Sequence, residues 1–521
     1  MLQLTRFISL FLLLLNSIAC KQIEEQKTNI DEAHVERPQR DAYKEIYRPQ
    51  FHFSPKEKWM NDPNGMVFYK GVYHLFYQYY PEDVVWGPMH WGHATSKDLI
   101  KWEHKGIKLY PDQLGYIFSG SAVVDHNNTS GFGTKESPPL VAIFTYHDAI
   151  AEKDGKDNYQ TQGIAYSLDN GETWTKYKNN PVIDNPGLKD FRDPKVRWHQ
   201  PSKKWIMCLA VADHISFYAS KDLIHWNKLS DFGSDIGAHG GVWECPDLFP
   251  MALNGTDDVK WILLVSINPG GPNGGSATQY FVGSFDGFQF VPDDTQTRWV
   301  DHGADNYAGV TYSNVSDDKR IFLGWMSNWD YAQETPTSPW RSAMTIPREL
   351  SLISLDSKYY IKSVPVKSFE KLRVKINDKK STYNKERYKI SDQAEILFKT
   401  QLNKVFTVKL LNGTGEHVVL HFDPDNEVLS FDRRKSGRVD FSKKFGNKIH
   451  TLPVEASDSL SEIRIIIDKS SIEIFIQDGR YVMTEQVFPK MPYNEMTITS
   501  PENITINELN IYHINSIWKH E

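Results

Sequence analysis

The segment Ser96–Trp102 reads SKDLIKW, and Ser220–Trp226 repeats it as SKDLIHW. Looser copies of this turn stand at Ser167–Trp174 and Ser284–Phe288. Each copy follows an apolar run, turns on Asp or Asx-Gly, and returns through an aromatic residue. Their spacing suits a four-stranded blade with loop insertions better than a solenoid. Chance similarity of turns is the alternative, and the near-identity of the first two copies weighs against it. With a closing segment around Ile321–Trp329, the repeats predict a β-propeller of about five blades.

Short apolar and aromatic runs surround these repeats and alternate with clusters of Gly, Pro, Asn and Asp. No long amphipathic helical pattern interrupts them, so the region is predicted to be all-β. The runs include Met66–Tyr69, Val72–Tyr79, Leu140–Tyr146, Trp205–Val211 and Trp261–Ile267.

The composition and the hydrophobic pattern of the sequence change beyond Leu350. Most of the Trp disappears, and alternating strands follow, for example Val405–Leu411 and Ile463–Ile467. We therefore expect a propeller over residues 46–350 and a separate antiparallel β-sandwich over residues 351–521, in a supporting role.

The N-terminal residues 1–20 have the pattern of an export signal. Arg6 precedes the apolar run Phe7–Leu15, which is too short to span a membrane. Ala19 before Cys20 matches a bacterial lipoprotein box, in which Cys20 would be lipidated. The box usually carries Leu where Ser17 stands, so a plain cleavable signal peptide is the alternative. The interpretation places the protein outside the cytoplasm, either lipid-anchored and on the outer cell surface, or secreted or periplasmic.

Residues 21–45 are rich in charged and amide side chains and predict a flexible tether. The net charge of −7 comes without a basic stripe, so nucleic acid is not an expected partner, and a membrane is expected only through the lipid anchor. Cys208 and Cys245 are expected to be free thiols, because nothing in their spacing requires a bridge.

Three acidic residues lie in distinctive motifs: Asp62 in WMNDPNG, Asp193 in FRDP and Glu244 in WECPD. Singly, each reads as a turn with a solvated acid. Together they fit glycoside hydrolysis, which needs one carboxylate ionised and another protonated. We expect Arg192 to hold Asp193 ionised, and a partly apolar setting to raise the pKa of Glu244. Loops at the starts of propeller blades converge on the axis, so the three acids could meet there.

These three motifs, in this order and spacing, resemble glycoside hydrolase family 32, which contains invertases, inulinases and levanases. The resemblance covers about residues 46–515. It implies a five-bladed propeller followed by a C-terminal β-sandwich, in agreement with the prediction from the repeats.

The resemblance also implies roles for individual residues. Asp62 would be the nucleophile, Glu244 the general acid/base, and Asp193 a transition-state stabiliser acting with Arg192. Retention of configuration predicts that the carboxyl groups of Asp62 and Glu244 lie ~5 to 5.5 Å apart. Asn306 stands where the family usually has an aromatic residue, which weakens the match at Tyr307. The implied substrate-binding residues are Trp59, Asn61, Gln78, Trp86, Phe118, Ser119, Arg192, Cys245, Tyr307 and Trp325.

The reaction needs no cofactor, and no metal site is expected, because His90 and His93 would face opposite sides of a strand. The glycine-rich loop Gly270–Gly275 lacks the Lys-Ser/Thr of a phosphate cradle and predicts a tight loop near the active site. The expected substrate is a fructan, levan or inulin, with endo or exo cleavage open. A sucrose-cleaving invertase, a fructosyltransferase and an inactive fructan-binding protein are the alternatives.

Overall fold

The computed structural model describes residues 43–316, 319–383 and 386–518. The predicted signal peptide, the lipidation site Cys20 and the predicted tether up to residue 42 lie outside these residues. The predicted end of the tether at residue 45 is wrong. Tyr43 stacks on Trp518 with ring centroids 4.0 Å apart, and Glu45 pairs with Arg48 at 2.7 Å.

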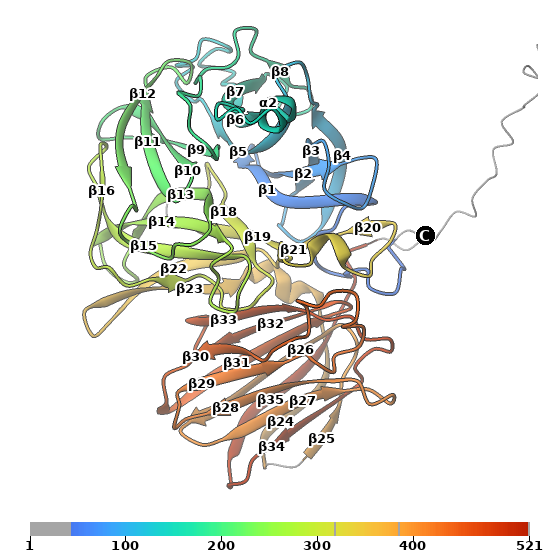
Figure 1. Ribbon diagram of the computed structural model, residues 1–521. Coiled ribbons are helices and arrows are strands. Elements are labelled where there is room, and N and C mark those ends of the chain that lie inside the picture. The colour runs from blue at the N-terminus through green and yellow to red at the C-terminus, as the bar shows by residue number, and fades with distance from the viewer. Residues whose placement is uncertain (1–42, 317–318, 384–385, 519–521) are drawn as a thin grey trace, which may run out of the picture. The chain divides into compact units, whose positions relative to one another are not determined.

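Five antiparallel sheets follow one another along the chain and surround a central axis, as predicted (Figure 1). Blade 1 contains β1 (Lys58–Tyr69), β2 (Val72–Tyr80), β3 (His90–Ser96) and β4 (Trp102–Leu109). Blade 2 contains β5 (Tyr116–Val124), β6 (Leu140–His147), β7 (Gln160–Ser167) and β8 (Thr175–Lys176), with helix α2 (Ala149–Lys153) after β6. Blade 3 contains β9 (Phe191–His199), β10 (Lys204–Val211), β11 (His214–Ser220) and β12 (Trp226–Phe232).

Blade 4 contains β13 (Val242–Ala252), β14 (Val259–Asn268), β15 (Ala277–Phe285), β16 (Phe290–Pro292) and β17 (Arg298–Trp299). Blade 5 contains β18 (Tyr307–Thr311), β19 (Arg320–Met326), β21 (Ala343–Met344), β22 (Arg348–Leu355) and β23 (Lys358–Pro365). The short helix η1 (Ala332–Glu334) and strand β20 (Trp340–Arg341) lie between β19 and β21, and β20 pairs in parallel with β1. Because β22 and β23 complete blade 5, the predicted domain boundary at residue 350 is wrong, and the propeller runs to Pro365.

The repeated segment is the turn between the third and fourth strands of a blade. In blade 1 the backbone N–H groups of Ile100 and Lys101 donate to Asp98 Oδ1 at 3.0 and 2.8 Å. The same two bonds recur on Asp222 in blade 3. Leu99 and Leu223 both adopt positive φ, 68° and 66°. The near-identical sequences therefore encode the same turn twice.

The β-sandwich follows the helix η2 (Lys367–Leu372) and consists of two six-stranded sheets. One sheet has the order β24 (Arg373–Tyr383), β35 (Thr505–Ile514), β26 (Ala394–Leu402), β31 (Ser457–Asp468), β32 (Ser471–Ile476) and β33 (Tyr481–Gln486). The other has the order β25 (Glu386–Lys389), β34 (Glu495–Thr499), β27 (Phe406–Leu411), β28 (His417–Asp423), β29 (Val428–Asp432) and β30 (His450–Pro453). Alternating buried and partly exposed positions, as along β27, send one apolar face of each sheet into the shared core.

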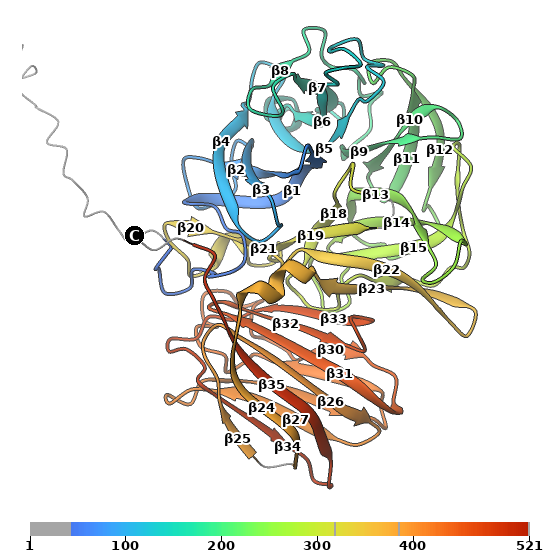
Figure 2. The same ribbon diagram turned by 180° about the vertical axis from the view of Figure 1, so that it is seen from behind.

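Strands β32 and β33 form the edge of the sandwich that lies against the propeller (Figure 2). Among the described residues, no helix is long and apolar enough to cross a membrane.

Candidate active site

A cavity of about 310 Å³ is lined by residues from all parts of the propeller. The three predicted acidic residues of this lining come from the innermost strands of three different blades: Asp62 from β1, Asp193 from β9 and Glu244 from β13. These innermost strands pack on one another around the axis, β1 against β5 and β18, and β13 against β9 and β18. The three predicted carboxylates therefore meet in one cavity.

Each innermost strand is irregular where it carries a predicted site residue. The pairing register shifts within β1 between Met60 and Pro63, and within β13 between Glu244 and Asp247. Strands β5, β9 and β18 shift in the same way, at segments that include Ser119, Asp193 and Ala308. Such bulges re-aim side chains. The positive φ of Asp193 (65°), Cys245 (45°) and Ala308 (53°) belongs to the same distortion.

Asp62 is fixed by neighbours on two other blades. The hydroxyl of Ser119 donates to Asp62 Oδ2 at 2.6 Å, and the side chain of Asn61 donates to Oδ1 at 3.1 Å. The thiol of Cys245 lies 3.7 Å from Oδ2. Burial, followed by the nearby charge of Glu244, raises the pKa of Asp62 to about 6, against the lowering effect of these donors. The side chain is therefore mostly ionised at neutral pH.

Glu244 lies in a polar setting, so the predicted partly apolar surroundings are wrong. Arg192 donates to Glu244 Oε1 through Nε at 3.1 Å and Nη2 at 2.9 Å. The hydroxyl of Tyr307 donates to the other carboxylate oxygen. Arg192 also pairs with Asp190 at 2.5 Å. Both oxygens of Glu244 are thus oriented by groups from other blades.

Asp193 was expected to be held ionised by Arg192, and this expectation is wrong. The hydrogen bonds of the guanidinium go to Glu244 and Asp190 instead, while Asp193 accepts from the backbone N–H of Cys245 at 3.0 Å. Burial raises the pKa of Asp193 to about 7, and the opposing influence of Arg192 does not offset it. A pKa near 7 leaves Asp193 partly protonated at neutral pH.

The predicted substrate-binding residues separate into two groups. Those on the cavity surface are Asn61, Gln78, Trp86, Phe118, Ser119 and Arg192. Phe118 stacks face to face on His147 with centroids 4.2 Å apart, which presents a fixed aromatic wall. The others are buried behind this surface: Trp59, Cys245, Tyr307 and Trp325. Trp59, for example, donates to Asn61 Oδ1 at 2.8 Å and so orients a residue of the lining.

Several residues of the cavity were not predicted. Asp190 stands two positions before Arg192, and this proximity was a signal that could have found it. Trp329 lies in the closing segment of the propeller, where its aromatic character was visible in the sequence. The others lie at strand ends and in the short helices α2 and η1, and they belong to no motif. The complete set is His147, Glu152, Gln160, Asp190, Val242, Asn268, Trp329 and Gln333.

The two cysteines among the described residues, Cys208 and Cys245, are free thiols, as predicted, and both are buried. Within residues 43–316, 319–383 and 386–518, no group of three or more His, Cys, Asp or Glu side chains has the arrangement of a metal site. The chemistry that the cavity offers is that of carboxyl groups in unlike surroundings, which suits acid, base and nucleophilic roles.

Known proteins with similar sequences and structures share this architecture. The chain is 45% identical over 492 residues to a levanase of Bacillus subtilis, covering 91% of this chain and 72% of that protein. It is 38% identical over 517 residues to the extracellular exo-inulinase of Aspergillus niger, covering 91% and 96%. The crystal structure of exo-inulinase from Aspergillus awamori superposes with a TM-score of 0.85 at 37% identity, covering 91% of this chain and 100% of that one.

Family models match both parts of the chain. The model of the glycosyl hydrolases family 32 N-terminal domain matches residues 52–364, and the family 32 C-terminal model matches residues 362–513. The match of the first model through residue 364 agrees with the end of blade 5 at Pro365. The chain therefore belongs to glycosyl hydrolase family 32 and is a glycoside hydrolase.

Proposed function

We propose that this enzyme hydrolyses β-fructosyl linkages of fructans with retention of configuration. The observation that carries the proposal is the convergence of Asp62, Asp193 and Glu244 on one small cavity, each in different surroundings. A levanase and exo-inulinases among the relatives support a fructan as the substrate class.

In the first step, Asp62 would attack the anomeric carbon of the fructosyl unit while the bond to the leaving oxygen breaks. Glu244 would donate its proton to that oxygen. In the second step, Glu244 would remove a proton from water, whose oxygen displaces Asp62 from the sugar. The pKa of about 6 leaves Asp62 available as a nucleophile at neutral pH.

Asp193 would bind fructose hydroxyls and stabilise the oxocarbenium-like transition state. Its raised pKa allows it to accept or donate a hydrogen bond near pH 7. Asn61, Gln78 and Ser119 would supply further polar partners for the furanose. Trp86 and Phe118, whose rings meet edge to face at 6.1 Å, would supply an apolar wall.

Replacement of the nucleophile tests these roles. Asp62→Ala should lose nearly all turnover, and added azide should restore it and release a fructosyl azide of inverted configuration. Asp190→Asn, which alters a cavity residue without a covalent role, should not become dependent on azide. Unchanged activity of Asp62→Ala would contradict the assignment.

We further propose exo cleavage. A cavity of about 310 Å³ lies at the lower end of the range for small-ligand pockets, so it suits a chain end better than a long internal stretch. Chromatography of the products from levan, inulin and sucrose over time should show free fructose from the start. A ladder of oligosaccharides from one polymer would contradict exo cleavage and identify the linkage.

Sucrose hydrolysis is a second candidate, because an invertase of Schizosaccharomyces pombe is 47% identical over 322 residues. The ratio of kcat/KM for sucrose to that for a fructan decides between the two substrates. Product analysis at high substrate concentration separates hydrolysis from transfer to a second sugar.

We also propose that the protein is exported and carries a lipid on Cys20. The support is the signal pattern of residues 1–20 together with the similarity to extracellular exo-inulinases. Cells that express the protein should incorporate labelled palmitate into it, and Cys20→Ser should abolish the label. A labelled Cys20→Ser protein would contradict this site of lipidation.

A further inference from the structure

The segment that leads into β18 is docked on the sandwich. The backbone N–H of His302 donates to Val482 O at 2.9 Å, and that of Asp305 donates to Thr484 O at 3.1 Å. Both acceptors belong to β33, the edge strand of its sheet. The propeller segment therefore covers an open sheet edge.

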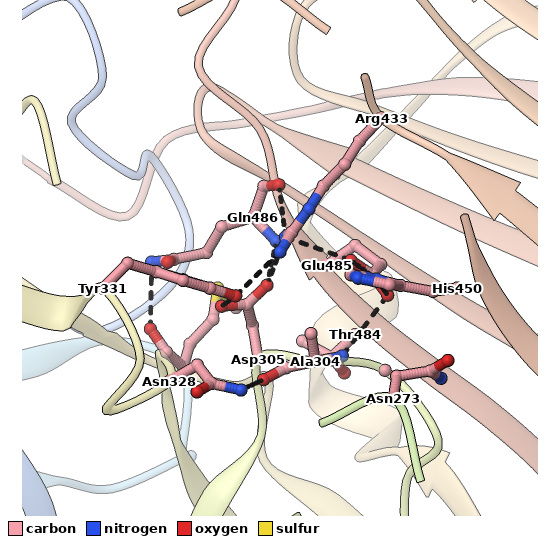
Figure 3. Close-up of polar contacts among 12 residues, drawn as sticks. Asn273, Ala304, Asp305, Asn328, Tyr331, Arg433, His450, Thr484, Glu485 and Gln486 are labelled. Atoms are coloured by element: carbon pink, nitrogen blue, oxygen red, sulfur yellow. Dashed lines mark hydrogen bonds and ion pairs between the residues drawn. The ribbon is translucent and has the colours of Figure 1, made fainter. Parts of the chain in front are cut away.

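The carboxylate of Asp305 is the centre of a buried cluster at this junction (Figure 3). Arg433 Nη1, from the sandwich, donates to Asp305 Oδ2 at 2.6 Å, and the backbone N–H of Gln486 donates to the same oxygen at 2.8 Å. The hydroxyl of Tyr331 donates to Oδ1 at 2.7 Å. Arg433 also pairs with Glu485 at 3.1 Å.

The same cluster holds a second propeller segment, which follows β19. Gln486 Nε2 donates to Met326 O at 3.0 Å, and Arg433 Nη2 donates to the hydroxyl of Tyr331 at 2.8 Å. The side chain of Asn328 ties the two segments together by donating to Ala304 O at 2.7 Å.

Both segments continue directly into the active site. Tyr307, two positions beyond Asp305, donates to Glu244. Trp329, between the anchored Asn328 and Tyr331, lines the cavity. A shift of the cluster would therefore displace both the donor to Glu244 and the cavity wall at Trp329.

Stability alone is a weak explanation for this cluster. Burying charges costs free energy of desolvation, and an apolar replacement of a buried ion pair is often equally stable. Arg433 is 1% exposed and also stacks over the ring of Phe445 at 4.0 Å. What the charged cluster adds over apolar packing is a defined direction for each hydrogen bond.

We propose that Arg433 of the sandwich is a positioning residue for the hydrolytic reaction, which acts through Asp305 to hold Tyr307 on Glu244. The inference rests on the proposed function of Glu244. It gives the sandwich a part in catalysis beyond support.

The test compares Arg433→Met with the conservative Arg433→Lys and with Arg464→Met. Arg464 pairs with Glu395 inside the sandwich, so its replacement controls for the loss of an ion pair away from the junction. Arg433→Met should lower kcat on a fructan on the order of tenfold to a hundredfold, because small misplacements of catalytic groups are costly. Arg433→Lys should recover part of this loss, and Arg464→Met should keep the kcat of the unmodified enzyme.

The pH dependence of kcat/KM adds a signature that a merely structural role would not produce. Glu244 is faced by Arg192, Tyr307, Asp62 and Asp193. If the Tyr307 hydroxyl no longer donates firmly to Glu244, the ionised carboxylate loses a stabilising hydrogen bond. The alkaline limb of the kcat/KM profile should therefore move to higher pH. In a double-mutant cycle, Arg433→Met and Tyr307→Phe should be strongly non-additive. Additive effects, or an unchanged kcat and pH profile, would overturn the proposal.

Amide hydrogen exchange tests, independently of turnover, whether Arg433 holds the two propeller segments in place. In Arg433→Met, peptides covering residues 302–308 and 326–333 should exchange faster, while those of blade 2 stay unchanged. If Arg433→Met does not fold, Asp305→Asn serves in the same measurements, because it keeps the shape and removes the charge. Unchanged exchange would overturn the proposal. Failure of the unmodified enzyme to cleave any fructoside would instead contradict the proposed function, and the exchange comparison would still be informative.

Discussion

At the scale of single residues, the active site concentrates negative charge that burial makes costly. Of the three carboxylates Asp62, Asp193 and Glu244, it is Glu244 that accepts hydrogen bonds from the guanidinium of Arg192, whose remaining bond goes to Asp190. Burial, followed by the nearby charge of Glu244, raises the pKa of Asp62 to about 6, and burial raises the pKa of Asp193 to about 7 against the opposing charge of Arg192. Such a cluster trades stability for reactivity.

The first prediction concerns the stability of Asp62→Asn. Because the folded protein raises the pKa of Asp62 from 3.8 to about 6, it binds more protons than the unfolded chain in that range, and stability falls as pH rises through it. Asp62→Asn should therefore be more stable than the unmodified enzyme at pH 7, by up to about 3 kcal/mol, and the gain should vanish near pH 4. Denaturant unfolding across this pH range measures the difference. A gain that does not depend on pH would contradict the ionisation argument.

The second prediction concerns the hydroxyl of Tyr307. Tyr307→Phe removes a donor to Glu244 and should lower kcat on the order of tenfold to a hundredfold. It should also move the alkaline limb of the kcat/KM profile to higher pH, because a hydrogen bond from Tyr307 favours the ionised carboxylate and its loss favours the protonated acid. Tyr312→Phe, a buried tyrosine outside the cavity lining, is the matched control and should leave the profile in place.

At the scale of elements, bulges and tight loops convert regular blades into a site. The glycine-rich loop Gly270–Gly275 connects β14 to β15. The last residue of β14, Asn268, belongs to the cavity lining. The loop also reaches the sandwich, where the side chain of Asn273 donates to Thr451 O at 2.9 Å. The loop thus begins two positions after a cavity residue and also reaches the junction.

The third prediction tests this loop through Gly275. Its φ is 66°, and a Cβ there would lie 2.1 Å from Asn328 Oδ1. Gly275→Ala should destabilise the protein by about 1–3 kcal/mol and raise KM, because Asn328 neighbours the cavity residue Trp329. Gly255→Ala is the matched control, with φ 79° and open space around the added carbon. If both variants lose the same stability and keep KM, the contact with Asn328 is unimportant.

At the scale of the whole molecule, the N-terminal segment joins the two domains. The ring of His52 lies between Asp468 and Glu473 of the sandwich, at 2.8 Å from each. Glu473 also pairs with Arg348 of blade 5 at 2.5 Å. The hydrogen bonds and charges of the two carboxylates overcome burial, the largest influence, and raise the pKa of His52 to about 9.

The fourth prediction follows from this protonated histidine. Its raised pKa contributes stability that is fully present below pH 6.5 and is lost as pH rises through about 9. His52→Gln should therefore lose about 3 kcal/mol of unfolding free energy at pH 6, and the difference should shrink above pH 9. Denaturant titrations at the two pH values measure it. An equal loss of unfolding free energy at both pH values would show that the packing of the His52 side chain, and not its charge, stabilises the contact between the domains.

The sequence by itself determined what depends on local interactions. A seven-residue turn with an Asp accepting two backbone N–H groups is encoded locally, so its repetition predicted the blades. The motifs around Asp62, Asp193 and Glu244 were likewise visible, and the order of the blades brought them to one axis.

Only the tertiary structure decided which groups face one another across blades. The partner of Arg192 is Glu244 from another blade rather than its neighbour Asp193, and the closing strands of blade 5 extend past residue 350. The cluster of Arg433 and Asp305 joins residues 128 positions apart and has no motif. Distances between side chains on separate strands are set by the packing of whole sheets, and residue order alone does not specify them.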